Sequence, residues 1–146
     1  MAASKKKRCA KCGAWKKLDE FHQSGDRLKS RCKACTREDN VKYWYKRVYH
    51  DALTRTNKNG LPFDITPEYI LSLYRKQNEL CHWFQIPMKP TVNQKDPQMP
   101  TIDRIVQEKG YTKGNIVIAC FAANIGRNET SEERFKEFVE LLRANS

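Results

Sequence analysis

The chain has 146 residues, of which 39% are hydrophobic, and this suits one compact domain or two small units that share a modest core. Its formal net charge at pH 7 is +11, and the whole excess lies in residues 1–60, which hold 17 Lys and Arg against 6 Asp and Glu, whereas residues 61–146 hold 11 of each. This asymmetry is typical of a protein that binds a polyanion, and the lack of a long apolar run or a signal-peptide pattern argues against a membrane or secreted protein.

The chain opens with a run of four cations, Lys5, Lys6, Lys7 and Arg8. Such a run near a chain end is either an arm that contacts phosphate groups or a solvated tail without a role, and the sequence leaves both readings open. Because aromatic residues are interleaved with the cations of this half, nucleic acid is the polyanion that we expect. Further candidates for contacts with its backbone are Lys33, Arg37, Lys42, Lys46 and Arg47.

Four cysteines form two C-x2-C pairs, Cys9 with Cys12 and Cys32 with Cys35, separated by 19 residues. This spacing is typical of a zinc site, in which each pair supplies two thiolates from one tight turn. Four protein ligands close the coordination shell of Zn²⁺, so we expect one structural zinc ion and not a catalytic one. His22 lies between the pairs, and with four thiols available it is expected at the surface.

Residues 36–53 have apolar side chains at helical spacing and predict a helix that links two units. Arg55 to Pro62 contains Asn-Lys-Asn-Gly and predicts a flexible connector. We therefore expect a basic zinc-binding module with its linking helix over residues 1–54, and a second domain over residues 55–146.

The second half begins with Thr66-Pro67-Glu68, which predicts a helix start with Thr66 as its N-cap. Residues 89–100 contain three prolines among polar residues and predict a loop. Thr130 to Glu133 resembles a capping box, and a final helix to about Arg143 is expected to follow. Its predicted buried side consists of Phe135, Phe138, Val139, Leu141 and Leu142. This helix either packs on its own core or forms a contact in a homodimer.

Between these helices, residues 101–127 predict a strand, a loop, a second strand and a short helix. Residues 102–105 alternate in character, residues 109–115 are rich in glycine and polar residues, residues 116–118 are apolar, and a helix is expected from Ala119 to Ile125 with Gly126 at its end. The polar residues in this stretch are Asp103, Arg104, Tyr111, Asn115, Asn124 and Arg127.

This stretch resembles the ββα-metal motif of HNH (His-Me finger) nucleases, in the branch that reads Asp-Arg-Ile, then Gly-Tyr-Thr-x-Gly-Asn, then a helix led by Cys with Asn four residues later. Residues 9–35 also look like a short zinc module often found ahead of HNH domains. The resemblance implies an α+β fold and a metal-dependent endonuclease of restriction or phage homing type. It further implies double-stranded DNA as substrate, with Asp103 and Asn124 holding Mg²⁺ or Mn²⁺. The setting would be the cytoplasm of a bacterium or of a phage-infected cell.

Arg104 stands where the family usually has the histidine that serves as general base, and an arginine cannot take up a proton at neutral pH. Tyr111 resembles a tyrosine of Arg-bearing relatives and is one substitute; His50, His82, bulk water and the substrate phosphate are others. Arg104 would then bind the scissile phosphate.

Asn115 resembles the middle asparagine of the family, which fixes the loop between the strands and does not touch substrate. Arg127 lies where relatives often have a lysine. It either binds phosphate or is an exposed cation near a helix end.

Cys81 and Cys120 stand where some relatives have two further cysteine pairs, but each lacks its partner cysteine here. We therefore expect no second zinc ion, and two buried thiols that lie close together. Two other functions stay open: a zinc-bearing DNA-binding protein without catalytic activity, and a toxin nuclease that acts on RNA.

Overall fold

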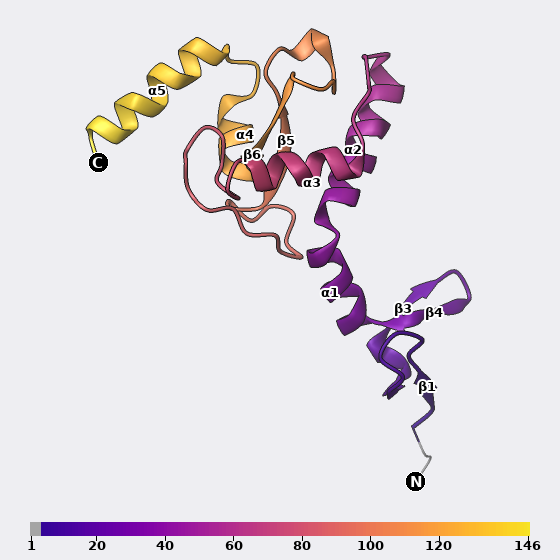
Figure 1. Cartoon of the computed structure of the whole chain (residues 1–146). Coiled ribbons are helices and arrows are strands. Elements are labelled where there is room, and N and C mark those ends of the chain that lie inside the picture. Colours follow the sequence, from indigo (N-terminus) through magenta and orange to yellow (C-terminus); the bar gives the residue numbers. More distant parts are fainter. Residues whose placement is uncertain (1–3) are drawn as a thin grey trace. The chain divides into compact units, whose positions relative to one another are not determined.

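The structure is a computed structural model that describes residues 4–146 (Figure 1). The chain divides between Lys42 and Tyr43 into two compact units. The boundary expected between residues 54 and 55 lies inside a helix of the second unit. Within the described range, no helix combines the length and the apolar character needed to cross a membrane.

The first unit consists of two small hairpins and a helix. Strands β1 (Lys6–Arg8) and β2 (Trp15–Lys17) pair antiparallel, and a 3-10 helix (Leu18–Glu20) leads into the antiparallel pair β3 (Phe21–Ser24) and β4 (Arg27–Cys32). Helix α1 (Lys33–Lys42) follows. The expected arm or tail at residues 5–8 is thus largely a strand. The buried core of this unit is small and consists of Cys9, Phe21, Cys32 and Cys35.

The second unit begins with helix α2 (Trp44–Asn59), followed by α3 (Pro67–Lys76). The single helix predicted over residues 36–53 is therefore two helices, α1 and α2, interrupted at Tyr43. Residues 55–59 are helical and not a flexible connector, because Gly60 takes a left-handed conformation (φ 64°) and ends α2 only there. The N-cap expected for α3 is confirmed, since the Thr66 side chain accepts a hydrogen bond from Tyr69 N at 3.1 Å.

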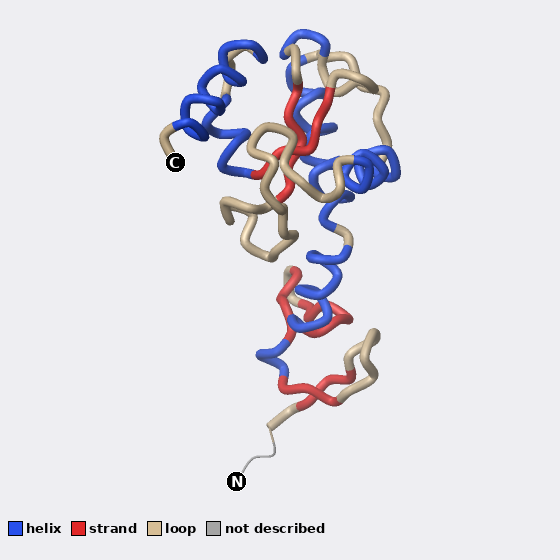
Figure 2. Tube along the Cα trace, turned by 60° about the vertical axis from the view of Figure 1, so that its left-hand side comes forward, coloured by secondary structure: helices blue, strands red, loops and turns tan. Residues whose placement is uncertain are grey.

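Strands β5 (Pro100–Arg104) and β6 (Ile116–Cys120) pair antiparallel, and helix α4 (Phe121–Arg127) follows directly (Figure 2). In the register Asp103 lies opposite Val117 and Arg104 opposite Ile116. The loop between the strands contains a 3-10 turn (Gln107–Lys109). Strand β5 and helices α3 and α4 all contact β6, and all five residues of β6 are buried; α2 contacts β5. The predicted α+β class with a four-cysteine module, a linking helix and a ββα unit is confirmed, although α4 begins two residues later than expected and Gly126 lies inside it.

Helix α5 (Glu132–Ala144) ends the chain, and its N-cap is Ser131, whose hydroxyl accepts a hydrogen bond from Arg134 N. Of its five expected core residues only Phe135 and Val139 are buried, whereas Phe138, Leu141 and Leu142 are exposed. Phe135 packs against the rings of Trp83 and Phe84. Phe138 and Leu142 lie three residues after Phe135 and Val139 and so belong to the same helical face, and their exposure shows that only part of this face of α5 meets the core.

Candidate active site and metal centre

Cys9, Cys12, Cys32 and Cys35 converge in the first unit, with all four sulfur atoms within 4.8 Å of one another. The Sγ atoms of Cys9 and Cys35 are 3.9 Å apart. Tetrahedral zinc with Zn–S bonds of about 2.3 Å requires S···S separations of about 3.8 Å. The four thiols therefore fit one tetrahedral zinc ion.

The backbone around this cluster favours the thiolate form of Cys9, whereas hydrogen bonds from the neighbouring thiols and burial raise the pKa of Cys35. Cys32 N donates a hydrogen bond to Cys9 Sγ at 3.3 Å, and this bond is the largest cause that lowers the pKa of Cys9 to about 6. The turn after Cys9 closes through a bond from Gly13 N to Cys9 O, with Gly13 at φ 71°. Since zinc binds thiolate and not thiol, the turn prepares Cys9 as a metal ligand.

The second unit contains a cleft of about 530 Å³ between α2, β5 and α4. Four of the residues predicted for catalysis or metal binding line it: Asp103, Arg104, Tyr111 and Asn124. Asn115, Arg127, His50 and His82 are not among its lining residues. The structure thus brings together the two expected metal ligands, the arginine that replaces the usual histidine, and the tyrosine.

Asn124, which lines the cleft, is held in a fixed orientation by hydrogen bonds. Its Nδ2 donates to Thr101 Oγ1 at 2.9 Å and to Ile102 O at 3.1 Å. The Thr101 hydroxyl in turn donates to Ala119 O at 2.8 Å. With both amide protons used, no donor among the described residues contacts Oδ1 of Asn124, so this oxygen is a ready acceptor or metal ligand.

Asp103 is only 3% exposed, and the protein engages both of its carboxylate oxygens. Oδ1 accepts from Arg127 Nη1 and Oδ2 from Trp83 Nε1, each at 2.8 Å. Burial raises the pKa of Asp103 above its ordinary value, while Arg127 and Trp83 act in the opposite direction. A carboxylate oxygen has two lone-pair sites, so these two bonds orient the group and leave one site on each oxygen.

Arg127 has neither of the two roles expected for it, because it is 1% exposed. Besides Asp103, its guanidinium donates to Arg104 O at 2.7 Å and Ile105 O at 2.6 Å. It also lies 4.9 Å from the ring centroid of Trp83. Arg127 therefore holds the end of β5 and the carboxylate of Asp103 from inside the protein.

Arg104 and Tyr111 lie against each other in the cleft, with the guanidinium carbon 4.9 Å from the ring centroid. Arg104 Nη1 donates to Gln107 O at 3.2 Å, which leaves most of its donors unused. Tyr111 is 2% exposed, and its hydroxyl has no partner among the described residues. The hydroxyl oxygen keeps some solvent exposure, and Tyr111 lines the cleft, so this oxygen is accessible to a ligand there.

Asn115 fixes the loop that carries Tyr111. Its Oδ1 accepts from Val106 N at 3.0 Å, and its Nδ2 donates to Val106 O and Gly110 O, each at 2.8 Å. Gly110 takes φ 65°, and a Cβ there would lie 2.2 Å from Pro62 O. The loop is therefore held closely against residues that precede α3.

The two histidines proposed as alternative bases lie elsewhere in the second unit. His50 is exposed, and its ring packs against Tyr49. His82 packs edge-on against Trp83, and burial lowers its pKa. Tyr111 is thus the candidate base that lines the cleft. Cys81 and Cys120 are buried and adjacent, as expected, with a bond from Cys120 N to Cys81 Sγ at 3.3 Å.

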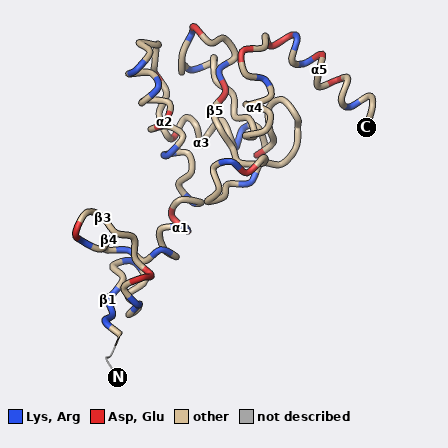
Figure 3. The backbone as a smooth tube through the Cα atoms, turned by 180° about the vertical axis from the view of Figure 1, so that it is seen from behind, with Lys and Arg blue, Asp and Glu red and all other residues tan. Residues whose placement is uncertain are grey.

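Sequence reasoning missed the part of the cleft formed by α2. Asp51 and Arg55 line it beside Arg47, one of the predicted DNA contacts. The spacing of these three residues, at i, i+4 and i+8, follows that of Val48 and Ala52 and would have placed them together on the helix. Of the other predicted cation contacts, Lys46 is exposed on α2 and the rest belong to the first unit. Figure 3 shows how Lys and Arg are distributed along the backbone of each unit.

No family model and no curated protein sequence matches this chain. Among solved structures, the structure of this chain is similar to the structure of the rare-cutting HNH restriction endonuclease PacI. The match covers 92% of each chain, with 20% sequence identity and a TM-score of 0.47.

Proposed function

We propose that this protein is a metal-dependent endonuclease that hydrolyses phosphodiester bonds in double-stranded DNA, of restriction or phage homing type. The observation that carries the proposal is the free Oδ1 of Asn124, fixed on the ββα unit in the same cleft as Asp103, Arg104 and Tyr111. The excess positive charge of residues 1–60 supports a polyanionic substrate.

The residues present fit a hard divalent cation. Mg²⁺ takes oxygen ligands and keeps several waters, so one or two protein ligands suffice. Asn124 offers an unpaired amide oxygen, and Asp103 offers the remaining lone pairs of an oriented carboxylate. When bound, the ion would polarise the phosphate and stabilise negative charge on the leaving 3′ oxygen.

Arg104 would bind the scissile phosphate, because a guanidinium has five donors in a fork and Gln107 O engages one nitrogen. Arg47 and Arg55 lie eight residues apart on α2, a rise of about 12 Å along the helix. Both line the cleft, so they would contact phosphates on either side of the scissile one.

Tyr111 would accept the proton of the attacking water. In this step the water oxygen bonds to phosphorus, its proton passes to the phenolate oxygen, and the bond from phosphorus to the 3′ oxygen breaks. The hydroxyl has no hydrogen-bond partner among the described residues, and the guanidinium of Arg104 lies beside the ring, where it would hold the phosphate next to this oxygen.

The test is cleavage of supercoiled plasmid and phage genomic DNA by the zinc-loaded protein, with Mg²⁺, with Ca²⁺ and without added divalent ion. Discrete products that require Mg²⁺ support the proposal. Tyr111→Phe should lower the cleavage rate by about 10²-fold or more, in line with removal of a general base. Tyr45→Phe, a tyrosine outside the cleft, is the matched control and should cleave as the wild type does.

A second candidate is a zinc-bearing DNA-binding protein without nuclease activity. It is favoured by Arg104 at the position of the usual base and by the engagement of both Asp103 oxygens within the protein. No cleavage under any condition, together with a gel shift of the same DNA, would establish this reading and exclude the endonuclease.

A further inference from the structure

The hairpin of β1 and β2, here called the ribbon, has two chemically different faces. Its register pairs Lys6 with Lys17, Lys7 with Lys16, and Arg8 with Trp15. Side chains alternate between faces along a strand, and paired residues share a face. The outer face therefore has Lys6, Arg8, Trp15 and Lys17, all exposed, whereas Lys7 and Lys16 lie half-buried on the inner face.

The inner lysines serve the fold of the first unit. Lys7 Nζ donates to Leu28 O at 2.9 Å and lies 5.7 Å from the ring centroid of Phe21. Lys16 Nζ lies 3.4 Å from a carboxylate oxygen of Glu20. By contrast, none of the outer four residues forms an ion pair within the described part of the chain. The outer face is therefore cationic, and the nearby carboxylate of Glu20, which interacts with Lys17 through space, pairs with the inner Lys16.

This outer face disfavours the isolated fold. Like charges directly opposite each other in an antiparallel pair are destabilising, and Lys6 stands opposite Lys17. Trp15 is 66% exposed, although the other two tryptophans, Trp44 and Trp83, are 3% and 4% exposed. A polyanion with apolar or aromatic surface would neutralise the cations and cover the indole at once.

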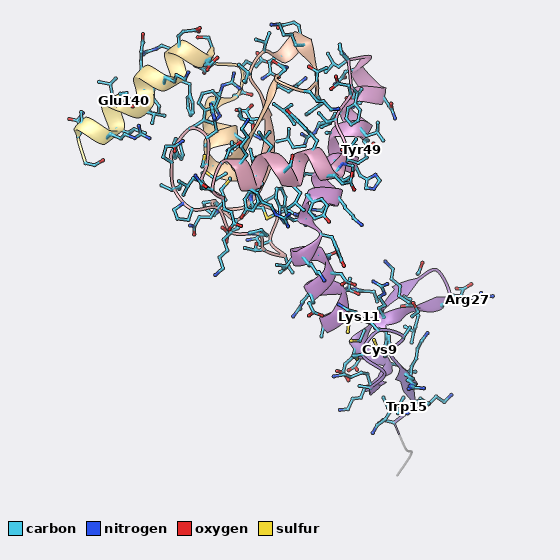
Figure 4. The ribbon with its side chains drawn as sticks, viewed as in Figure 1. Cys9, Lys11, Trp15, Arg27, Tyr49 and Glu140 are labelled. Atoms are coloured by element: carbon cyan, nitrogen blue, oxygen red, sulfur yellow. The ribbon has the colours of Figure 1, made fainter. Side chains whose placement is uncertain are left out.

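We propose that the outer face of the ribbon is a second DNA contact, separate from the cleft. Lys6, Arg8 and Lys17 bind phosphates, and the indole of Trp15 packs on the sugars or exposed base edges between them. Trp15 is labelled in Figure 4. Duplex DNA is the form that we assign. Its major groove, about 12 Å wide, admits a two-stranded ribbon, whose strands are about 4.8 Å apart. This assignment rests on the proposed function in so far as DNA is the substrate.

Trp15 itself supplies the test, because it is the one tryptophan of the three that a quencher reaches. Full-length, zinc-loaded protein is titrated with a duplex in Ca²⁺ buffer, and acrylamide quenching of tryptophan fluorescence is measured. We expect duplex DNA to protect the exposed fluorophore and a Trp15→Phe protein to show no such change. Trp15→Ala should weaken duplex binding by about fivefold or more. Phe138→Ala removes an exposed aromatic residue of α5 and should leave binding unchanged.

The cations are tested by salt dependence. The double variant Lys6→Ala and Lys17→Ala should lower the slope of log affinity against log salt by about 1.8, since each released phosphate contact contributes about 0.9. Lys76→Ala with Lys136→Ala is the charge-matched control in the second unit. Zinc content, measured for every variant, shows that the first unit is intact.

The proposal is overturned if duplex DNA leaves the quenching of the wild-type protein unchanged and Trp15→Ala binds the duplex as tightly as the wild type does. Protection of Trp15 by a single strand but not by a duplex would overturn the groove assignment. Cleavage is scored separately with Mg²⁺. Cleavage without protection of Trp15 would refute the ribbon contact alone, and protection without cleavage would refute the endonuclease alone.

Discussion

The buried ion pair of Asp103 and Arg127 allows a quantitative prediction. Both side chains are at most 3% exposed, and their atoms are 2.8 Å apart. Replacing Arg127 by Met leaves an uncompensated carboxylate in the interior and also removes the bonds to Arg104 O and Ile105 O. Removing one partner of such a pair costs about 3–5 kcal/mol, so we expect Arg127→Met to lower the free energy of unfolding of the second unit by that amount.

The assay is urea denaturation in a Trp15→Phe background, because the remaining tryptophans, Trp44 and Trp83, then report on the second unit alone. Adding Asp103→Leu to Arg127→Met should recover part of the loss, since an apolar pair no longer leaves a charge unpaired. The exposed pair of Arg134 and Glu137 is the control, and its disruption should cost at most about 1 kcal/mol. A loss below about 1 kcal/mol for Arg127→Met, with no recovery in the double variant, would refute the reasoning.

Three further predictions concern other parts of the chain. Removing zinc with a strong chelator, or replacing Cys12 by Ser, should unfold the first unit, read by loss of hydrogen-exchange protection over residues 9–42; retained protection would contradict a structural site. Gly110→Ala should lower the urea stability of the second unit by about 2 kcal/mol, because its φ is 65° and a Cβ meets Pro62 O; an unchanged midpoint would be inconsistent with this loop. Lys11 lowers the pKa of Asp39, so their pair should contribute stability above the ordinary carboxylate pKa that is lost as pH falls through the lower folded value; Asp39→Asn should flatten this acid dependence, and an unaltered pH profile would contradict the pairing.

Local chemistry made part of this structure predictable. The two cysteine pairs indicated one metal site because each pair of ligands lies in one tight turn. Such a turn depends on neighbouring residues and not on the tertiary fold. The Thr66 cap was readable for the same reason, since its partner Tyr69 N is three residues away. The order of strands and helix over residues 101–127 followed from hydrophobic periodicity and turn residues.

Features that depend on tertiary partners were not predictable in this way. Arg127 looks like an exposed cation in the sequence, and its burial depends on Asp103 and Trp83, which lie far from it along the chain. The position of Asp51 at the cleft depends on how α2 packs against β5. Leu141 is exposed because only a small part of α5 packs on the core. An amphipathic pattern predicts which face of a helix is apolar, but not how much of that face is covered.

The measurement that tests the central claim most directly is the rate of Mg²⁺-dependent DNA cleavage by Asn124→Ala compared with Asn145→Ala. The first variant removes the free Oδ1 in the cleft, and the second removes an exposed amide of the same type at the end of α5. We predict that Asn124→Ala cleaves at least about 10²-fold more slowly at unchanged DNA affinity, whereas Asn145→Ala cleaves as the wild type does. Equal cleavage by the two variants would contradict the assignment of the cleft as the nuclease site.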